Sequence, residues 1–164
     1  MNKHKDNTGM SHAPDPAGIY ERITRYCAYQ ERCAWDAEKK LAEWKVPRGR
    51  ISILMKSLKD EGFIDDERFA QTFVRGKFRI NKWGRVKISY ELKGRKIPEI
   101  IIRSAMREIS QEDYRKTVRE LVLKKKSEIK PGKNLNIREK IITFVIGKGF
   151  EFDLVADILK ELKI

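Results

Sequence analysis

Basic side chains recur at helical spacing between Asp66 and about Asn81, and they are suited to binding phosphate. Four cations, at intervals of seven, four and three residues, share one side of a helix: Arg68, Arg75, Arg79 and Lys82. The opposite side is apolar and carries Phe69, Ala70, Phe73 and Ile80. Guanidinium and ammonium groups bind phosphate mainly through charge, and arginine adds bidentate hydrogen bonding. The segment therefore predicts a helix that buries aromatic rings and presents cations to a polyanion.

The basic pattern continues beyond this helix. Arg85 and Lys87 follow it. A later helix also has cations on one side, in a weaker pattern, with Arg115, Arg119 and a short lysine run. A solvated face that only keeps the protein soluble is the alternative for both helices. The residues predicted to contact nucleic acid or its protein assembly are Arg68, Arg75, Lys77, Arg79, Lys82, Arg85, Lys87, Arg115, Arg119, Lys124 and Lys126.

Trp83 lies between two cations, Lys82 and Arg85. A nucleic-acid base could stack on its ring. The alternative is a packing anchor at the start of a helix, which an alignment with Trp35 favours.

Signatures of catalysis and metal binding are absent from the sequence. Gly147-Lys148-Gly149 lacks the other residues of a phosphate-binding loop. Both histidines, His4 and His12, lie near the N-terminus, and the spacing of Cys27 and Cys33 is not that of a metal site. The acidic run 65–67 is better suited to capping a helix than to holding a cation. We therefore expect no catalytic residue, no metal and no cofactor.

The overall composition agrees with a polyanionic partner. The chain has 164 residues and a formal net charge of +13, which favours nucleic acid or an acidic membrane surface. No run of about 18 apolar residues is present, so we expect no membrane span. The first 18 residues are polar and lack the apolar core of a secretory signal, which predicts a disordered tail and a cytoplasmic protein.

An internal repeat of about 50 residues organises the rest of the chain. Apolar residues at i, i+3, i+4 and i+7 recur three times, which indicates three equivalent helix faces: Ile51, Leu54, Met55 and Leu58; Ile102, Ala105, Met106 and Ile109; Val155, Ile158, Leu159 and Leu162. Each repeat is predicted to form one long and two shorter helices, and neighbouring repeats stack because one alone cannot bury its apolar faces. The predicted boundaries are 1–18 for the tail and 19–62, 63–112 and 113–164 for the repeats.

Local signals support these helices, with one conflict. Gly62 suits a helix end, Asp65 suits an N-cap, and Asn136 with Glu139 forms a capping box. Residues 85–92, however, alternate strictly between polar and apolar, which is typical of a strand. We predict a helix there because the equivalent residues 36–41 are rich in helix formers.

Three stretches of the sequence resemble the signature of the RecX family of regulatory proteins: Phe63–Ala70, Trp83–Ile88 and Glu91–Leu92. The matching positions, which we expect to be structural, are Asp66, Phe69, Gly84, Ile88, Glu91 and Leu92. The sequence departs from the family pattern in two places. Lys96 replaces a glycine that needs positive φ, so this helix end is expected to differ in shape. Lys87 stands where the family has arginine and would grip a phosphate less well.

The resemblance implies an all-α fold, an elongated and curved array of three tandem three-helix repeats with about nine helices. It also implies a non-enzymatic regulator of the RecA recombinase that lies in the groove of the RecA–DNA filament. Such a protein restrains RecA ATPase, strand exchange and the SOS response, and some members bind single- or double-stranded DNA alone. We expect a monomer. The alternatives are a RecA-independent DNA-binding module and a protein-interaction scaffold whose charge serves solubility.

Overall fold

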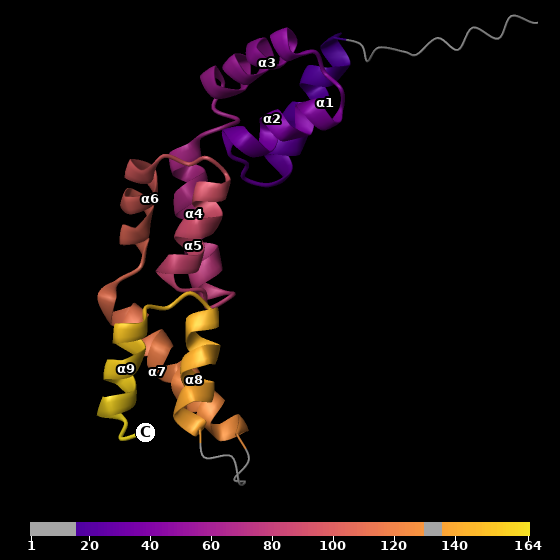
Figure 1. Cartoon of the computed structure of the whole chain (residues 1–164). Coiled ribbons are helices and arrows are strands. Elements are labelled where there is room, and N and C mark those ends of the chain that lie inside the picture. Colours follow the sequence, from indigo (N-terminus) through magenta and orange to yellow (C-terminus); the bar gives the residue numbers. More distant parts are fainter. Residues whose placement is uncertain (1–15, 130–135) are drawn as a thin grey trace, which may run out of the picture.

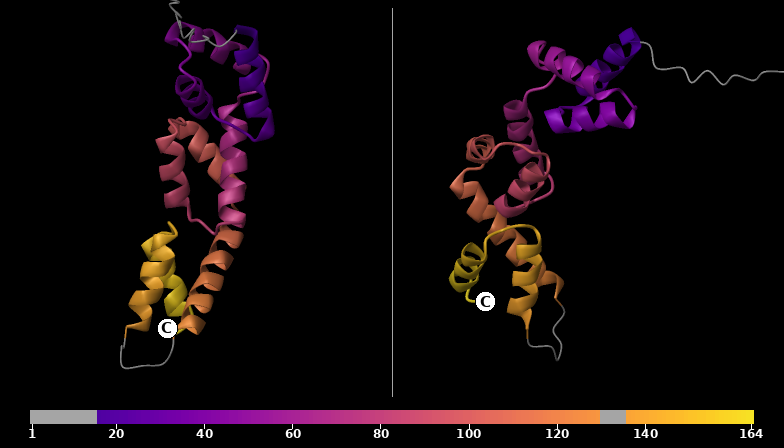
Figure 2. Two further views of the ribbon diagram at one scale, coloured as in Figure 1. Left: turned by 90° about the vertical axis from the view of Figure 1, so that its right-hand side faces the viewer. Right: turned by 45° about the horizontal axis from the view of Figure 1, so that its top comes forward.

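The computed structural model describes residues 16–129 and 136–164. Over these residues the chain forms an elongated, curved array of three three-helix units (Figure 1), so the predicted all-α repeat fold is confirmed. The helices are α1 (Pro16–Tyr29), α2 (Ala34–Glu43), α3 (Arg48–Asp60), α4 (Asp66–Arg79), α5 (Arg85–Gly94), α6 (Glu99–Ala105) with the 3₁₀ turn η1 (Met106–Glu108), α7 (Gln111–Glu128), α8 (Ile137–Gly147) and α9 (Phe152–Glu161). In the left view of Figure 2, α4 and α7 follow one another along the length of the molecule. None of the described helices is long and apolar enough to cross a membrane.

The predicted tail overlaps the first helix. Residues 1–15 lie outside the described residues, whereas residues 16–18 belong to α1 rather than to a tail. Helix α1 begins at Pro16, since proline is well tolerated in a first helical turn.

Capping side chains fix the helix starts as the sequence predicts. The Asp65 carboxylate accepts a hydrogen bond from the Arg68 backbone N–H at 2.9 Å, and the Asn136 side chain accepts one from Glu139 N–H at 3.3 Å. Ser110 does the same for α7, where its hydroxyl accepts from Asp113 N–H at 3.0 Å. Gly62 follows the end of α3 with a φ of 75°, which glycine adopts without steric cost.

Helix α5 resolves the conflict over residues 85–92 in favour of a helix. Its alternating pattern comes from two apolar faces on opposite sides. Ile88 and Leu92, four residues apart, are fully buried, whereas Val86 and Tyr90 are 56% and 77% exposed. The strand-like alternation therefore marks a helix with one face in the core and a second apolar face left in solvent.

The turn after the second helix of each unit has the same backbone conformation. Lys45, Lys96 and Gly149 each lie two residues past a helix end, with φ values of 58°, 57° and 91°. After α5, the Ile97 N–H donates to the Leu92 carbonyl at 3.1 Å, and Val46 and Leu41 make the same bond after α2. The expectation that Lys96 changes the shape of its helix end is therefore wrong, because lysine here occupies the left-handed conformation itself.

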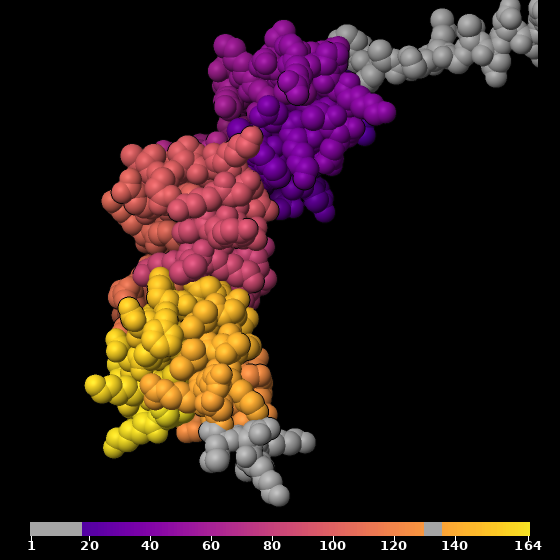
Figure 3. Space-filling model, viewed as in Figure 1, coloured from indigo at the N-terminus to yellow at the C-terminus, as the bar shows by residue number. Residues whose placement is uncertain are grey.

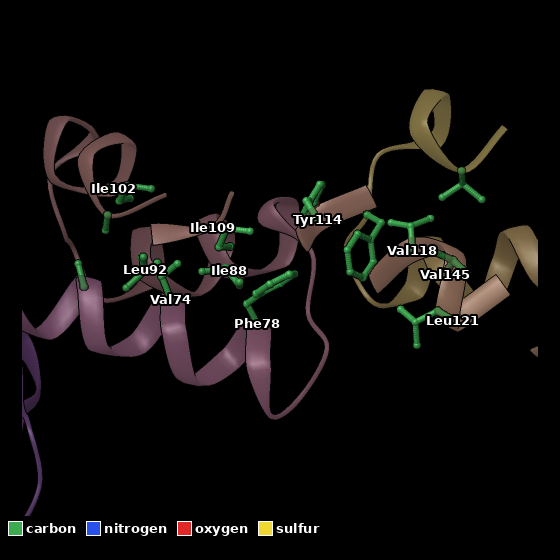
Figure 4. Close-up of a cluster of buried hydrophobic side chains, with 14 of the residues drawn as sticks. Val74, Phe78, Ile88, Leu92, Ile102, Ile109, Tyr114, Val118, Leu121 and Val145 are labelled. Atoms are coloured by element: carbon green, nitrogen blue, oxygen red, sulfur yellow. The ribbon is translucent and has the colours of Figure 1, made fainter. Parts of the chain in front are cut away.

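Two hydrophobic clusters form the core. One extends through the second and third units, and Figure 4 follows it from Val74 and Phe78 in α4 to Val118 and Leu121 in α7. The other is confined to the first unit and its exit, from Ile19 to Ile64. Among the described residues of the first unit, Cys33 alone is buried in the larger cluster. The second and third units thus share a continuous core, whereas the first unit packs largely within itself.

The second and third units meet backbone to backbone. The Gly84 N–H donates to the Lys148 carbonyl at 2.8 Å, and the Val86 N–H donates to the Gly149 carbonyl at 3.1 Å. A Cβ added to Gly84 would lie 2.1 Å from the Gly149 carbonyl oxygen, so only glycine permits this approach. Gly84, which matches the family signature, thus lies at a contact between backbones that a larger residue would prevent.

Tyr114 completes this second junction. Its ring lies between Phe78 and Phe150, with centroids 5.9 and 5.0 Å away. Its hydroxyl accepts a hydrogen bond from the Arg85 N–H at 2.8 Å and donates one to the Glu151 carboxylate at 2.7 Å. Burial, together with the nearby Glu151, raises the pKa of the Tyr114 phenol well above its usual range. The neutral hydroxyl therefore caps the first turn of α5 across the junction.

The first and second units are joined instead by side chains. The Asp66 carboxylate accepts a hydrogen bond from the Ala34 N–H at 2.8 Å, which caps α2 from the neighbouring unit. Arg95 forms an ion pair with Glu91 at 3.0 Å and reaches Asp36 at 3.9 Å. Both Asp66 and Glu91, which match the family signature, thus make contacts within the protein.

The alignment of Trp35 with Trp83 is wrong. The two tryptophans are 48 residues apart, whereas the starts of α2 and α5, Ala34 and Arg85, are 51 apart. Trp35 is consequently the second residue of α2 and corresponds to Val86. Trp83 precedes the Gly84 N-cap of α5.

Candidate nucleic-acid interface

The buried face of α4 differs in part from the predicted one. Phe69, Ala70, Val74 and Phe78 are buried, and Phe73 packs against them. Ile80, predicted on the apolar side, is 81% exposed because it is the C-cap and lies past the last helical residue. Lys82 also lies beyond the helix, with a φ of 54°, so the helical wheel does not describe its position.

Of the four cations predicted on one side of α4, two arginines are bound within the protein. The Arg68 guanidinium donates to the Glu31 carboxylate at 3.0 Å and to the Gly62 carbonyl at 3.0 Å. The hydrogen bonds from Arg68 to Glu31 raise the pKa of Arg68 above its usual value. Arg75 pairs with Glu108 at 3.1 Å. Phosphate contact by either arginine would have to compete with these carboxylates.

Lys77 and Lys87 lie over the ring of Trp83. Their ammonium groups are 4.8 and 4.4 Å from the centroid of the indole's ring, and Trp83 itself packs on the larger core cluster. Cations at this distance are attracted to the ring face. Of the two predicted roles of Trp83, these contacts favour the packing anchor, because a base would have to displace a lysine to stack there.

Arg85 holds the second junction together. Its guanidinium lies 4.2 Å from the centroid of the Tyr114 ring and donates to Gln111 Oε1 and to the Ile109 carbonyl, both at 3.1 Å. These contacts explain the residue structurally. A role in binding DNA stays a prediction.

The two arginines predicted on one side of α7 contact α9. Arg115 and Arg119 both donate to the Glu161 carboxylate, with Arg119 at 2.6 Å. Lys124 and Lys126 are exposed and form no ion pair within 4.0 Å among residues 16–129 and 136–164. Lys124 and Lys126 are therefore more available to a ligand than Arg115 and Arg119.

Three cations, from α4, from the connection after it and from α7, lie where the end of α4 meets α7. Arg79, Lys82 and Lys116 line a hollow of about 220 Å³, together with Asp113 and Glu120. We call these three residues the α4–α7 cation cluster. Arg79 and Lys116 are exposed, and none of the three forms an ion pair in the described part of the chain. Cations that several elements bring to one hollow are of the kind that contacts a phosphate backbone.

Lys116 was not among the predicted contacts. In the sequence it lies between Asp113 and Glu120, a pattern typical of a mixed, solvated face. Only the packing of α7 against the end of α4 brings it to Arg79 and Lys82. No sequence signal marks that approach.

Comparison with known proteins identifies the family. The model of the RecX second three-helix domain matches residues 65–106, which cover α4 to α6. The regulatory protein RecX of Clostridium acetobutylicum is 32% identical over 127 residues, which are 75% of this chain and 58% of that protein. The chain belongs to the RecX family. The regulatory protein RecX of Bacillus cytotoxicus is 28% identical over 144 residues, which are 88% of this chain and 53% of that protein.

Solved RecX structures have the same fold. A crystal structure of a regulatory protein RecX matches with a TM-score of 0.77 and 26% identity, over 87% of this chain and 71% of that one. A second, of RecX from Lactobacillus salivarius, matches with a TM-score of 0.79 and 24% identity, over 90% and 96%. The curated relatives are named regulatory proteins rather than enzymes, and this chain spans only about half of the length of those relatives.

Proposed function

We propose that this RecX-family chain is a non-enzymatic inhibitor of the RecA recombinase, acting as a monomer in the cytoplasm. It lies in the groove of the RecA–DNA filament and restrains ATP hydrolysis, strand exchange and the SOS response. Membership of the family supports RecA as the partner. The elongated array supports a filament as the target, since successive units of a repeat protein present one extended surface to a periodic partner.

The observation that carries the DNA contact is the α4–α7 cation cluster. Arg79, Lys82 and Lys116 come from two helices and the connection after α4, and they keep their charge free of ion pairs in the described residues. Among the other predicted cations, Arg68, Arg75, Arg115 and Arg119 already have carboxylate partners. We therefore assign phosphate contact first to the cluster, then to Lys124 and Lys126, and protein contact to the remaining surface of the array.

The test is RecA ATPase on single-stranded DNA, with wild type compared with the double variant Arg79→Gln plus Lys116→Gln. We expect wild type to lower the rate and the variant to need at least about fivefold more protein for the same effect, since two phosphate-binding charges are removed. Lys56→Gln plus Lys59→Gln on α3 is the matched control, because it removes the same charge from exposed positions outside the cluster.

A salt titration of DNA binding without RecA separates the alternatives. For each phosphate that the protein no longer neutralises, the slope of log K against log salt becomes shallower by about 0.9 for duplex and 0.7 for single strands. Tight binding without RecA, combined with no effect on RecA ATPase, would favour a free-standing DNA-binding module. Wild-type behaviour of the double variant in both assays would favour an interaction scaffold. A RecA rate unchanged by a severalfold excess of wild type would end the RecA proposal.

A further inference from the structure

Every residue other than glycine that has a positive φ in the described part of the chain is a lysine. These residues are Lys45, Lys82, Lys96 and Lys163, with φ values of 58°, 54°, 57° and 52°. Three of them come directly after the C-cap of a helix, and Lys82 comes two residues after one. This conformation brings a Cβ close to the following carbonyl oxygen, so glycine and asparagine are the usual residues there. The repeated use of lysine needs an explanation beyond the backbone.

Two of these lysines occupy the same position in successive units. Lys45 and Lys96 are 51 residues apart, and their turns have the same hydrogen bonds. The Lys45 N–H donates to the Ala42 carbonyl and the Lys96 N–H to the Lys93 carbonyl, both at 2.9 Å. Both lysine side chains are exposed, and neither forms an ion pair within residues 16–129 and 136–164. The array therefore presents one unpaired cation at the same turn of its first and second units.

Glycine occupies this turn only where a neighbouring unit closes on it. In the third unit the equivalent residue is Gly149, which is buried, and a Cβ there would lie 2.3 Å from the Lys87 Cβ. At the first junction the residues equivalent to Gly84 and Gly149 are Cys33 and Lys96, and a groove of about 710 Å³ separates α1 and α2 from α5. At this open turn, lysine adds a charge at a cost in backbone energy that glycine would avoid.

The helix dipole does not account for these lysines. A cation near the last turn of a helix interacts favourably with the dipole, but α2 and α5 already have Lys40 and Lys93 there, in relaxed helical conformation. Lys96 instead lines a hollow of about 220 Å³ together with Lys39, and neither has a carboxylate within 4.0 Å among the described residues. Backbone strain that the fold does not require is typical of places that hold a ligand.

We propose that Lys45 and Lys96 contact carboxylates on successive subunits of the RecA filament, one lysine for each unit. Figure 3 shows the units following one another along the molecule, so equivalent turns face successive parts of a long partner. A DNA strand has a phosphate at every nucleotide and gives no reason for one cation per repeat, whereas a polymer of identical subunits offers the same carboxylate once per subunit. The inference rests on the proposed function and names residues that contact protein rather than DNA.

The experiment measures inhibition of RecA ATPase on single-stranded DNA by glycine variants. Lys96→Gly removes the charge and relieves the left-handed backbone, so a loss of inhibition cannot come from a damaged fold. We expect half-maximal inhibition to need about threefold more Lys96→Gly than wild type. Lys45→Gly plus Lys96→Gly should need about ninefold more, because contacts with separate subunits add in free energy. Urea denaturation should show both variants to be at least as stable as wild type.

Two further variants separate position and charge from the backbone change. Lys163→Gly is the matched control, because Lys163 is exposed and has the same conformation but follows the third helix of its unit. It should inhibit as wild type does. Lys96→Arg keeps the charge and should also keep the inhibition. In the absence of RecA, the double glycine variant should bind DNA within about twofold of wild type, since its lost charges do not contact phosphate.

Three results would overturn the proposal and leave the proposed function intact. Wild-type inhibition by the double glycine variant would mean that the filament does not contact these turns. An equal weakening of DNA binding without RecA would mean that the lysines contact phosphate. An equal loss in Lys163→Gly and Lys96→Gly would mean that net charge, and not the position in the repeat, matters. Only a lack of any effect of wild type on RecA would end both proposals together.

Discussion

The two junctions between units are built differently although the units are repeats of one pattern. At the second, Gly84 and Gly149 bring two backbones into hydrogen-bonding contact, and a single hydrophobic cluster passes through. At the first, polar side chains make the hydrogen bonds, chiefly Asp66 with the Ala34 N–H and Arg68 with Glu31, and among the described residues of the first unit only Cys33 is buried in that cluster. Residue size at two positions of the repeat therefore decides how closely two units approach.

The largest effect is expected when the glycine of the second junction is replaced. In Gly84→Ala the new Cβ would be 2.1 Å from the Gly149 carbonyl oxygen, a backbone atom that cannot move alone. We expect a decrease of about 3 kcal/mol in the free energy of unfolding, measured by urea denaturation. Gly76→Ala in α4 is the control: its Cβ meets nothing within 4 Å, and an increase of up to about 1 kcal/mol is expected. A similar result for both variants would refute a tight second junction.

The open junction should respond less and only locally. Asp66→Ala removes the carboxylate that caps α2, and we expect a cost of about 1 kcal/mol. Because the first unit has its own core cluster, amide hydrogen exchange should rise in α2 and stay unchanged in α8. Equal acceleration in both helices would show that the two junctions are equally coupled.

The smallest effect is expected at Lys96, in the turn that follows the second helix of each unit. Lys96 has a φ of 57°, which costs a residue with a Cβ more than it costs glycine. Lys96→Gly should therefore raise the unfolding free energy by about 0.5 to 1 kcal/mol, since the greater entropy of the unfolded glycine offsets part of the gain. Lys93→Gly, inside α5, should change stability by about 1 kcal/mol in the opposite direction. Lower stability in both variants would contradict the strained turn.

Much of the fold could be predicted from the sequence because its signals are local. The caps at Asp65 and Asn136 satisfy N–H groups only three residues away, and the apolar spacing of residues 51–58 marks a buried helix face directly. The alternation in residues 85–92 misleads only as long as every apolar residue is assumed to be buried. In α5 two of them, Val86 and Tyr90, face solvent.

The candidate site could not be predicted to the same extent, because it depends on contacts between distant residues. Glu161 lies 46 and 42 residues from Arg115 and Arg119, and nothing near either arginine reveals that pairing. The approach of Lys116 to Arg79 likewise follows from how α7 packs on α4. The sequence shows how many cations a helix face carries, but only tertiary packing shows which of them already have partners.

The side-chain contacts of the first junction also have a mechanical consequence. An ion pair such as Arg95 with Asp36, at 3.9 Å, can lengthen or re-form at a slightly different angle at little cost, whereas the short backbone hydrogen bonds at Gly84 cannot. A rod with one compliant joint and one stiff joint bends at the compliant one. We therefore expect the second and third units, which share one core cluster, to move together, and the first unit to adjust its angle to the surface on which they lie.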